Sequence, residues 1–125
     1  IILLEGTPRD YKSIRALVSA ARYFHDRLFV LAAGDQHRDL DHDGASALGA
    51  MANVVIVAGA AADGTPLPGA NTGALTIDLA APAGTLDGEN SGLVSGAASQ
   101  RAAAHVAALA ARLRAVEPAI PATAM

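Results

Sequence analysis

The chain has 125 residues, of which 52% are hydrophobic, 17% are charged and 3% are aromatic, and its formal net charge is −3. This composition excludes a disordered chain, fits one compact domain, and argues against nucleic acid as a partner. The chain contains no cysteine, which removes disulfides, thiolate zinc sites and a cysteine nucleophile together.

Apolar β-prone runs at 1–4, 28–33 and 53–58 predict three strands that are covered on both faces, as in a parallel sheet. A shorter strand is predicted at 76–80. The first run is too short for a membrane span or for the core of a signal peptide. A chain that begins inside a strand, without an initiator Met, is typical of a fragment or a processed product.

A helix is predicted after the first strand. Thr7 is expected as its N-cap and Pro8 as its first helical residue, and the helix should continue to about Asp26. Its apolar residues recur every three or four positions and form one buried stripe: Tyr11, Ile14, Leu17, Val18, Ala21 and Phe24. Its basic residues face solvent: Lys12, Arg15 and Arg22.

The last helix is predicted from Ala98 to about Val116, and a loop is predicted at 84–96. The order of elements predicts an α/β fold with a mainly parallel sheet flanked by helices, in one domain at 1–116. The remaining residues, 117–125, are expected to form a frayed tail or a linker.

The polar loop at 35–44 follows the second strand, and a small-residue turn precedes the last helix. Ligand and catalytic groups of parallel sheets gather at the carboxyl ends of the strands. The loop and the turn are therefore the candidate site, although their adjacency does not follow from the sequence.

Five segments resemble the subtilisin-like serine proteases, in that family's order. IILLEG resembles the family's VINLSLG, LFVLAAGD resembles VVVAAAGN, and NVVIVAGA resembles the strand that follows in the family. ANTGALTIDLAAPA resembles SNYG followed by VDLAAPG, and ASQRAAAHVAAL resembles GTSMATPHVAGAAAL. The resemblance implies the C-terminal part of a subtilisin-like domain, and it favours a secreted or periplasmic location.

The resemblance also implies a Ser-His-Asp triad, in which serine attacks, histidine takes its proton and aspartate orients the histidine. The family's aspartate and histidine precede the region that this chain covers, and the chain has neither an Asp-Thr-Gly nor a His-Gly-Thr-His segment. His105 matches a helix histidine that is not the catalytic one; His25, His37 and His42 lie elsewhere. The missing groups would come from the N-terminal half of such a domain or from another chain.

The nucleophile position has three readings. The gap-free alignment from His105 places Gln100 at the catalytic serine, and an amide cannot attack as that nucleophile. An insertion at Arg101, as a bulge in the first helical turn, brings Ser99 to the position instead. A third alignment needs two extra residues and places Ala98 there.

Asp35 stands where the family carries the asparagine of its oxyanion hole. An ionised carboxylate would repel the developing negative oxygen, and the loss of one such donor costs about 10²–10³ in rate. Only a protonated Asp35 could donate, which requires a strongly raised pKa.

The segment from Asp39 to Gly44 matches the first half of a calcium loop, with Asp39, Asp41 and Asp43 as candidate ligands. The bidentate glutamate of such loops is missing, because Ala50 stands at the twelfth position. A solvated acidic turn is the simpler interpretation. His37 and His42 flank this loop and are candidates for a transition-metal site, whereas His105 is expected to be a hydrogen-bonded core residue.

Three functions remain at this point. The first is a catalytically degenerate subtilisin-like domain, a pseudoprotease that acts in binding, folding or regulation. The second is an active serine endopeptidase with Ser99 as nucleophile and with aspartate and histidine supplied by a segment outside this chain. The third is a small metal- or ligand-binding α/β module.

Overall fold

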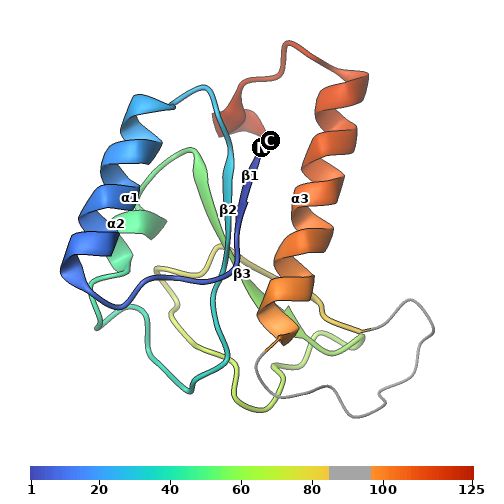
Figure 1. The fold of residues 1–125 in the computed structure, drawn as a ribbon. Coiled ribbons are helices and arrows are strands. Elements are labelled where there is room, and N and C mark those ends of the chain that lie inside the picture. Colours follow the sequence, from blue (N-terminus) through green and yellow to red (C-terminus); the bar gives the residue numbers. More distant parts are fainter. Residues whose placement is uncertain (85–96) are drawn as a thin grey trace.

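The computed structural model describes residues 1–84 and 97–125, and the predicted loop lies almost entirely outside them (Figure 1). One parallel sheet holds the four strands in the order β1-β2-β3-β4. The strands are β1 (Ile2–Leu4), β2 (Phe29–Ala32), β3 (Val54–Ala60) and β4 (Leu79–Pro82). The predicted α/β fold with a parallel sheet is confirmed.

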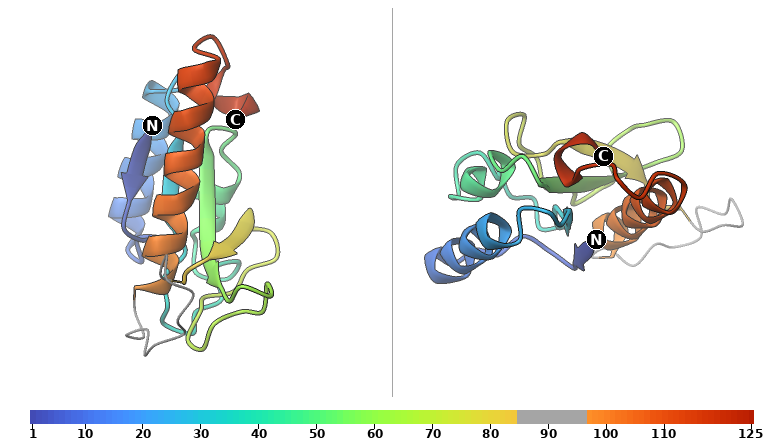
Figure 2. Two further views of the ribbon diagram at one scale, coloured as in Figure 1. Left: turned by 90° about the vertical axis from the view of Figure 1, so that its right-hand side faces the viewer. Right: turned by 90° about the horizontal axis from the view of Figure 1, so that it is seen from above.

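Helices cover both faces of this sheet. They are α1 (Tyr11–Tyr23), α2 (Ser46–Gly49), α3 (Ala98–Val116) and the short 3₁₀ helix η1 (Ala122–Ala124). Helices α1 and α2 lie on one face and α3 on the other, so that in the left view of Figure 2 α3 stands in front of the sheet and α1 behind it. The described chain contains no helix long and apolar enough to cross a membrane.

Strand β2 shows why apolar and polar residues do not alternate along the predicted strands. Val30 and Ala32 belong to the core beneath α3, whereas Phe29 and Leu31 belong to the core beneath α1 and α2. All four side chains are buried, because each face of the strand has its own helical cover.

The start of α1 differs from the prediction. Asp10 is the N-cap, and its carboxylate accepts a hydrogen bond from the Ser13 backbone N–H at 2.9 Å. Thr7 is not a cap, because its hydroxyl donates instead to the Ala33 carbonyl, 2.9 Å away at the end of β2. The helix ends at Tyr23 rather than near Asp26.

The buried stripe of α1 is narrower than predicted. Ile14 and Ala21 are buried, but Tyr11 is 72% exposed and Phe24 is 45% exposed. The apolar spacing thus predicts the buried residues in the middle of the helix correctly and fails at Tyr11 and Phe24.

Three further differences lie after β2 in the chain. The fourth strand begins at Leu79 rather than at residue 76, and α2 was not predicted. Residues 117–125 are not frayed, because Ala122 is buried and Met125 packs against the core beneath α3.

Candidate functional site

The carboxyl end of β2 meets the first turn of α3, so the loop and the turn singled out in the sequence are neighbours. Asp35 follows Gly34 directly after this strand, and Ser99 is the second residue of α3. The Ser99 hydroxyl donates to the Asp35 carboxylate at 2.9 Å, and the Ser99 backbone N–H donates to the same carboxylate oxygen, Oδ2, at 3.2 Å. A buried serine-carboxylate pair therefore joins two segments 64 residues apart.

The Ser99 hydroxyl is fully committed to these contacts. Its oxygen also accepts a hydrogen bond from the Gly34 backbone N–H at 3.0 Å, and its side chain is 0% exposed. No histidine is among its hydrogen-bond partners in the described part of the chain. A serine nucleophile needs access to substrate and a base that takes its proton, and Ser99 has neither in this arrangement.

Asp35 acts as a remote cap of α3. The N-cap residue of this helix, Ala97, has no side chain that can accept a hydrogen bond, so the Asp35 carboxylate satisfies the Ser99 N–H in its place. Its negative charge also lies at the positive end of the helix dipole. Its other oxygen, Oδ1, is buried and has no hydrogen-bond partner among the described residues.

This capping changes what the site can do chemically. An oxyanion hole uses donors such as the nucleophile's own backbone N–H and a side-chain amide. Here the Ser99 N–H already donates to the Asp35 carboxylate, so this donor is occupied within the protein.

The helix geometry bears on the three alignments. Helix α3 runs without interruption from Ala98 to Val116, and the Arg101 N–H donates to the Ala97 carbonyl at 3.2 Å in the regular helical pattern. The first turn thus contains no bulge that would mark Arg101 as an insertion. Gln100, which the gap-free alignment assigns to the nucleophile position, is half-buried in this turn. The third alignment rests partly on Ser95 and Gly96, which lie outside the described residues.

Asn71 holds the loop that carries Asp35, a role that was not predicted from the sequence. Its Oδ1 accepts from the backbone N–H groups of Gln36 and Arg38, both at 2.9 Å, and its Nδ2 donates to the Ala33 carbonyl at 2.8 Å. Its backbone N–H donates to the Gly34 carbonyl at 3.0 Å. The only signal in the sequence was its place in the segment that resembles SNYG.

Gly34 is required at the centre of this network. Its φ is +95°, and a Cβ there would lie 2.8 Å from the Asn71 amide nitrogen and 2.6 Å from Gln36 Oε1. A side chain would both strain the backbone and displace Asn71.

His105 does not lie in the core, contrary to the prediction. The residue is exposed, although its Nδ1–H donates to the Pro82 carbonyl at 3.0 Å and so links α3 to the end of β4. The expected hydrogen bond is present, with a backbone partner at the sheet edge.

The acidic loop does not form a calcium site in this structure. The Asp39 carboxylate contacts His42 Nδ1 at 2.8 Å and accepts a hydrogen bond from the Asp41 N–H. The Asp41 carboxylate accepts from the Leu75 N–H at 3.2 Å. The Asp43 carboxylate pairs with Arg38. Within residues 1–84 and 97–125, no three His, Asp or Glu side chains gather as a metal site would require. The three carboxylates cap turns and fix neighbouring loops instead, and neither the calcium site nor the histidine site gains support.

Comparison with known proteins gives one match. A model described as the subtilase family matches residues 5–125. No curated protein and no solved structure matches the chain.

Proposed function

The chain belongs to the subtilase family, and from this premise we propose that it is a catalytically degenerate subtilisin-like domain that acts in binding, folding or regulation. The observation that carries the proposal is the buried pair of Ser99 and Asp35. A buried serine whose hydroxyl and backbone N–H both donate to a carboxylate inside the protein has a structural role rather than that of a nucleophile.

Two independent departures support this assignment. Gln100 stands at the nucleophile position in the gap-free alignment. Asp35 stands where the resemblance places the amide of the oxyanion hole, and the loss of one such donor costs about 10²–10³ in rate. A single change could be compensated, but both act on the same step, the attack on a carbonyl.

The sheet edge supports a partner for this domain. Strand β1 pairs with β2 on one side only within the described residues, and its Leu3 is 43% exposed. An open parallel edge with apolar side chains is a template for another strand. We therefore infer that β1 receives a strand from the N-terminal half of a subtilisin-like domain or from another chain. Sedimentation that gives a stable, soluble monomer of this chain would contradict this partner.

The rival is an active endopeptidase in which Ser99 attacks. For that role the serine would have to leave Asp35 and Gly34, rotate to solvent and meet a histidine from outside the chain. Leaving Asp35 and Gly34 breaks the two hydrogen bonds of the Ser99 hydroxyl that hold the start of α3.

Peptide hydrolysis separates the two functions. With the N-terminal half of a subtilisin-like domain added to supply the aspartate and the histidine, turnover of a quenched fluorescent peptide library would be measured for the chain, for Ser99→Ala and for the matched control Ser46→Ala, in which an exposed serine of α2 is removed. The proposal predicts only a background rate that is equal in all three proteins. A rate that disappears in Ser99→Ala and persists in Ser46→Ala would establish the rival.

A further inference from the structure

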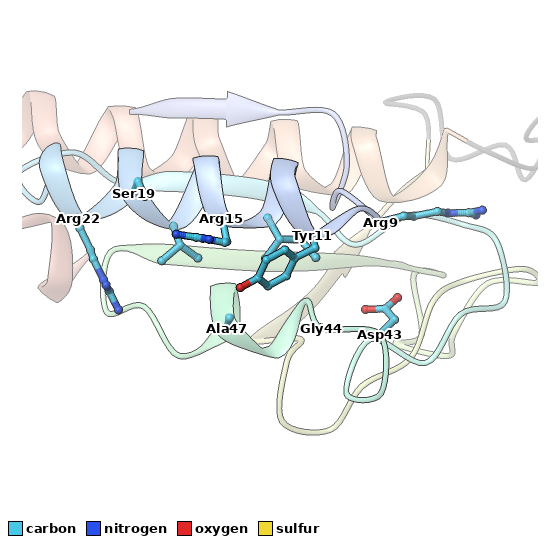
Figure 3. Close-up of a pocket in the computed structure, with 10 residues that line it drawn as sticks. Arg9, Tyr11, Arg15, Ser19, Arg22, Asp43, Gly44 and Ala47 are labelled. Atoms are coloured by element: carbon cyan, nitrogen blue, oxygen red, sulfur yellow. The ribbon is translucent and has the colours of Figure 1, made fainter.

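A groove between α1 and α2 lies on the face of the sheet opposite to α3 and its Ser99–Asp35 pair (Figure 3). Its volume is about 450 Å³. The floor is apolar and contains Ile14, Val18 and Ala47, and three arginines line it, Arg9, Arg15 and Arg22. We propose that this arginine groove binds an acidic, partly apolar peptide segment of a partner protein.

Within residues 1–84 and 97–125, no ion pair neutralises the positive charge of the groove. The ion pairs within the described residues join Arg27 to Asp26, Arg38 to Asp43 and His42 to Asp39, and none involves Arg9, Arg15 or Arg22. The one carboxylate that lines the groove, Asp43, is thus occupied by Arg38. In a chain whose net charge is −3, this groove brings together arginines that pair with no carboxylate of the described residues.

Two of the three arginines, Arg15 and Arg22, lie along one line of α1, whereas Arg9 precedes the helix. Tyr11, Arg15, Val18 and Arg22 follow a spacing of four, three and four residues, which places them on one stripe of α1. The Arg15 guanidinium lies 5.6 Å from the centre of the Tyr11 ring, close enough for a cation-π contact that holds it in place. Figure 3 shows Arg22 extending on the side of α2, and Arg9 pointing away at the other end.

The length of this stripe selects the class of ligand. From Tyr11 to Arg22 the helix rises by roughly 16 Å, at about 1.5 Å per residue. A single phosphate or carboxylate would meet one arginine only, whereas an extended peptide of about five residues spans the distance. Alternating side chains of such a peptide suit a groove that has an apolar floor and basic flanks, because arginine forms strong paired hydrogen bonds with carboxylates.

Nucleic acid fits the groove less well. A single strand binds through bases that stack on aromatic side chains along a basic track, and the one aromatic side chain that lines this groove, Tyr11, already carries Arg15. The apolar floor has no counterpart in a phosphate backbone. This alternative is one of the outcomes of the test.

Fluorescence anisotropy tests the proposal. The probes are a labelled peptide of alternating glutamate and leucine, a peptide of alternating lysine and leucine, and a labelled oligothymidine strand. The proteins are the unchanged chain, the double variant Arg15→Gln/Arg22→Gln, and the control Arg112→Gln, which removes an exposed arginine of α3 on the opposite face. Circular dichroism verifies that each variant is folded.

The glutamate–leucine peptide should bind, and its binding should weaken with salt. The double variant should bind this peptide at least about tenfold more weakly than the unchanged chain does, and Arg112→Gln should bind it as tightly as the unchanged chain. Equal binding by the double variant, equal binding of the lysine–leucine peptide, tighter binding of the oligothymidine, or no binding of any probe would each overturn the proposal. The inference goes beyond the proposed function and is independent of it, because peptide hydrolysis reports on Ser99 and anisotropy reports on α1.

Discussion

The backbone of Gly59 in β3 lies against the first turn of α3, so closely that a Cβ on Gly59 would be 3.0 Å from the backbone nitrogen of Ser99. The same carbon would be 2.9 Å from the Ala98 carbonyl carbon. This contact brings the start of the helix down to the sheet, where the Ser99 N–H and hydroxyl reach Asp35. The candidate site therefore depends on a residue that has no side chain.

Gly59→Ala should destabilise the protein by about 2 kcal/mol or more, because the new methyl group meets backbone atoms that cannot move without displacing α3. Urea denaturation measures the free energy of unfolding. Gly6→Ala is the matched control, since a Cβ at Gly6 meets nothing within 4 Å. Equal stability of the two variants would refute the close packing described here.

Ser99→Ala should cost about 2–3 kcal/mol, because the Gly34 N–H and the Asp35 carboxylate each lose a partner in a buried site. The exposed serine of α2 provides the comparison, and Ser46→Ala should change the free energy of unfolding by less than about 0.5 kcal/mol. A Ser99→Ala protein as stable as the unchanged chain would mean that the serine is not a structural tie.

Asn71→Ala should destabilise by about 3 kcal/mol, because it removes the side-chain bonds to Ala33, Gln36 and Arg38 and leaves their backbone groups unpaired. Hydrogen exchange should also accelerate at the amides of Gln36 and Arg38. The adjacent exposed residue gives the control, Thr72→Ala, for which both the stability and the exchange rates are expected to stay the same.

Ser13, through its side chain and then its backbone N–H, lowers the pKa of Asp10 from its ordinary value of 3.8. A lowered pKa in the folded state means that the ionised cap stabilises the protein above the unfolded pKa, and that this stabilisation disappears as the pH falls through the folded pKa. Denaturation at neutral and at acidic pH should show that the advantage of the unchanged chain over Asp10→Asn shrinks on acidification. An advantage that is the same at both pH values would exclude a role for the charge of Asp10.

The sheet could be predicted from the sequence because strands such as Val54–Ala60 are buried on both faces and therefore read as unbroken apolar runs. The start of α1 could not be predicted from the sequence. The choice between Thr7 and Asp10 as its cap depends on the Ala33 carbonyl, which lies 26 residues away in the chain and accepts the hydrogen bond of the Thr7 hydroxyl. Local helix-capping propensity does not take this distant carbonyl into account.

The candidate site, too, could be predicted only in part from the sequence. Ligand and catalytic groups gather at the carboxyl ends of parallel strands, and this rule identified the loop of Asp35 and the turn before Ser99 as candidates. The bond between them, and the clamp that Asn71 places on the loop, depend on side-chain orientations that only the folded chain defines. The acidic loop shows the reverse case, because its spacing matched a calcium loop while its carboxylates turned to separate partners.

The most direct measurement of the central claim is the reaction of Ser99 with a fluorophosphonate, read by intact mass and by peptide mapping. If Ser99 is a buried structural tie, the unchanged chain and Ser99→Ala remain equally unlabelled, also when the N-terminal half of a subtilisin-like domain is added. Stoichiometric labelling at Ser99 that is abolished by Ser99→Ala would contradict the account and assign the chain to the active serine endopeptidases.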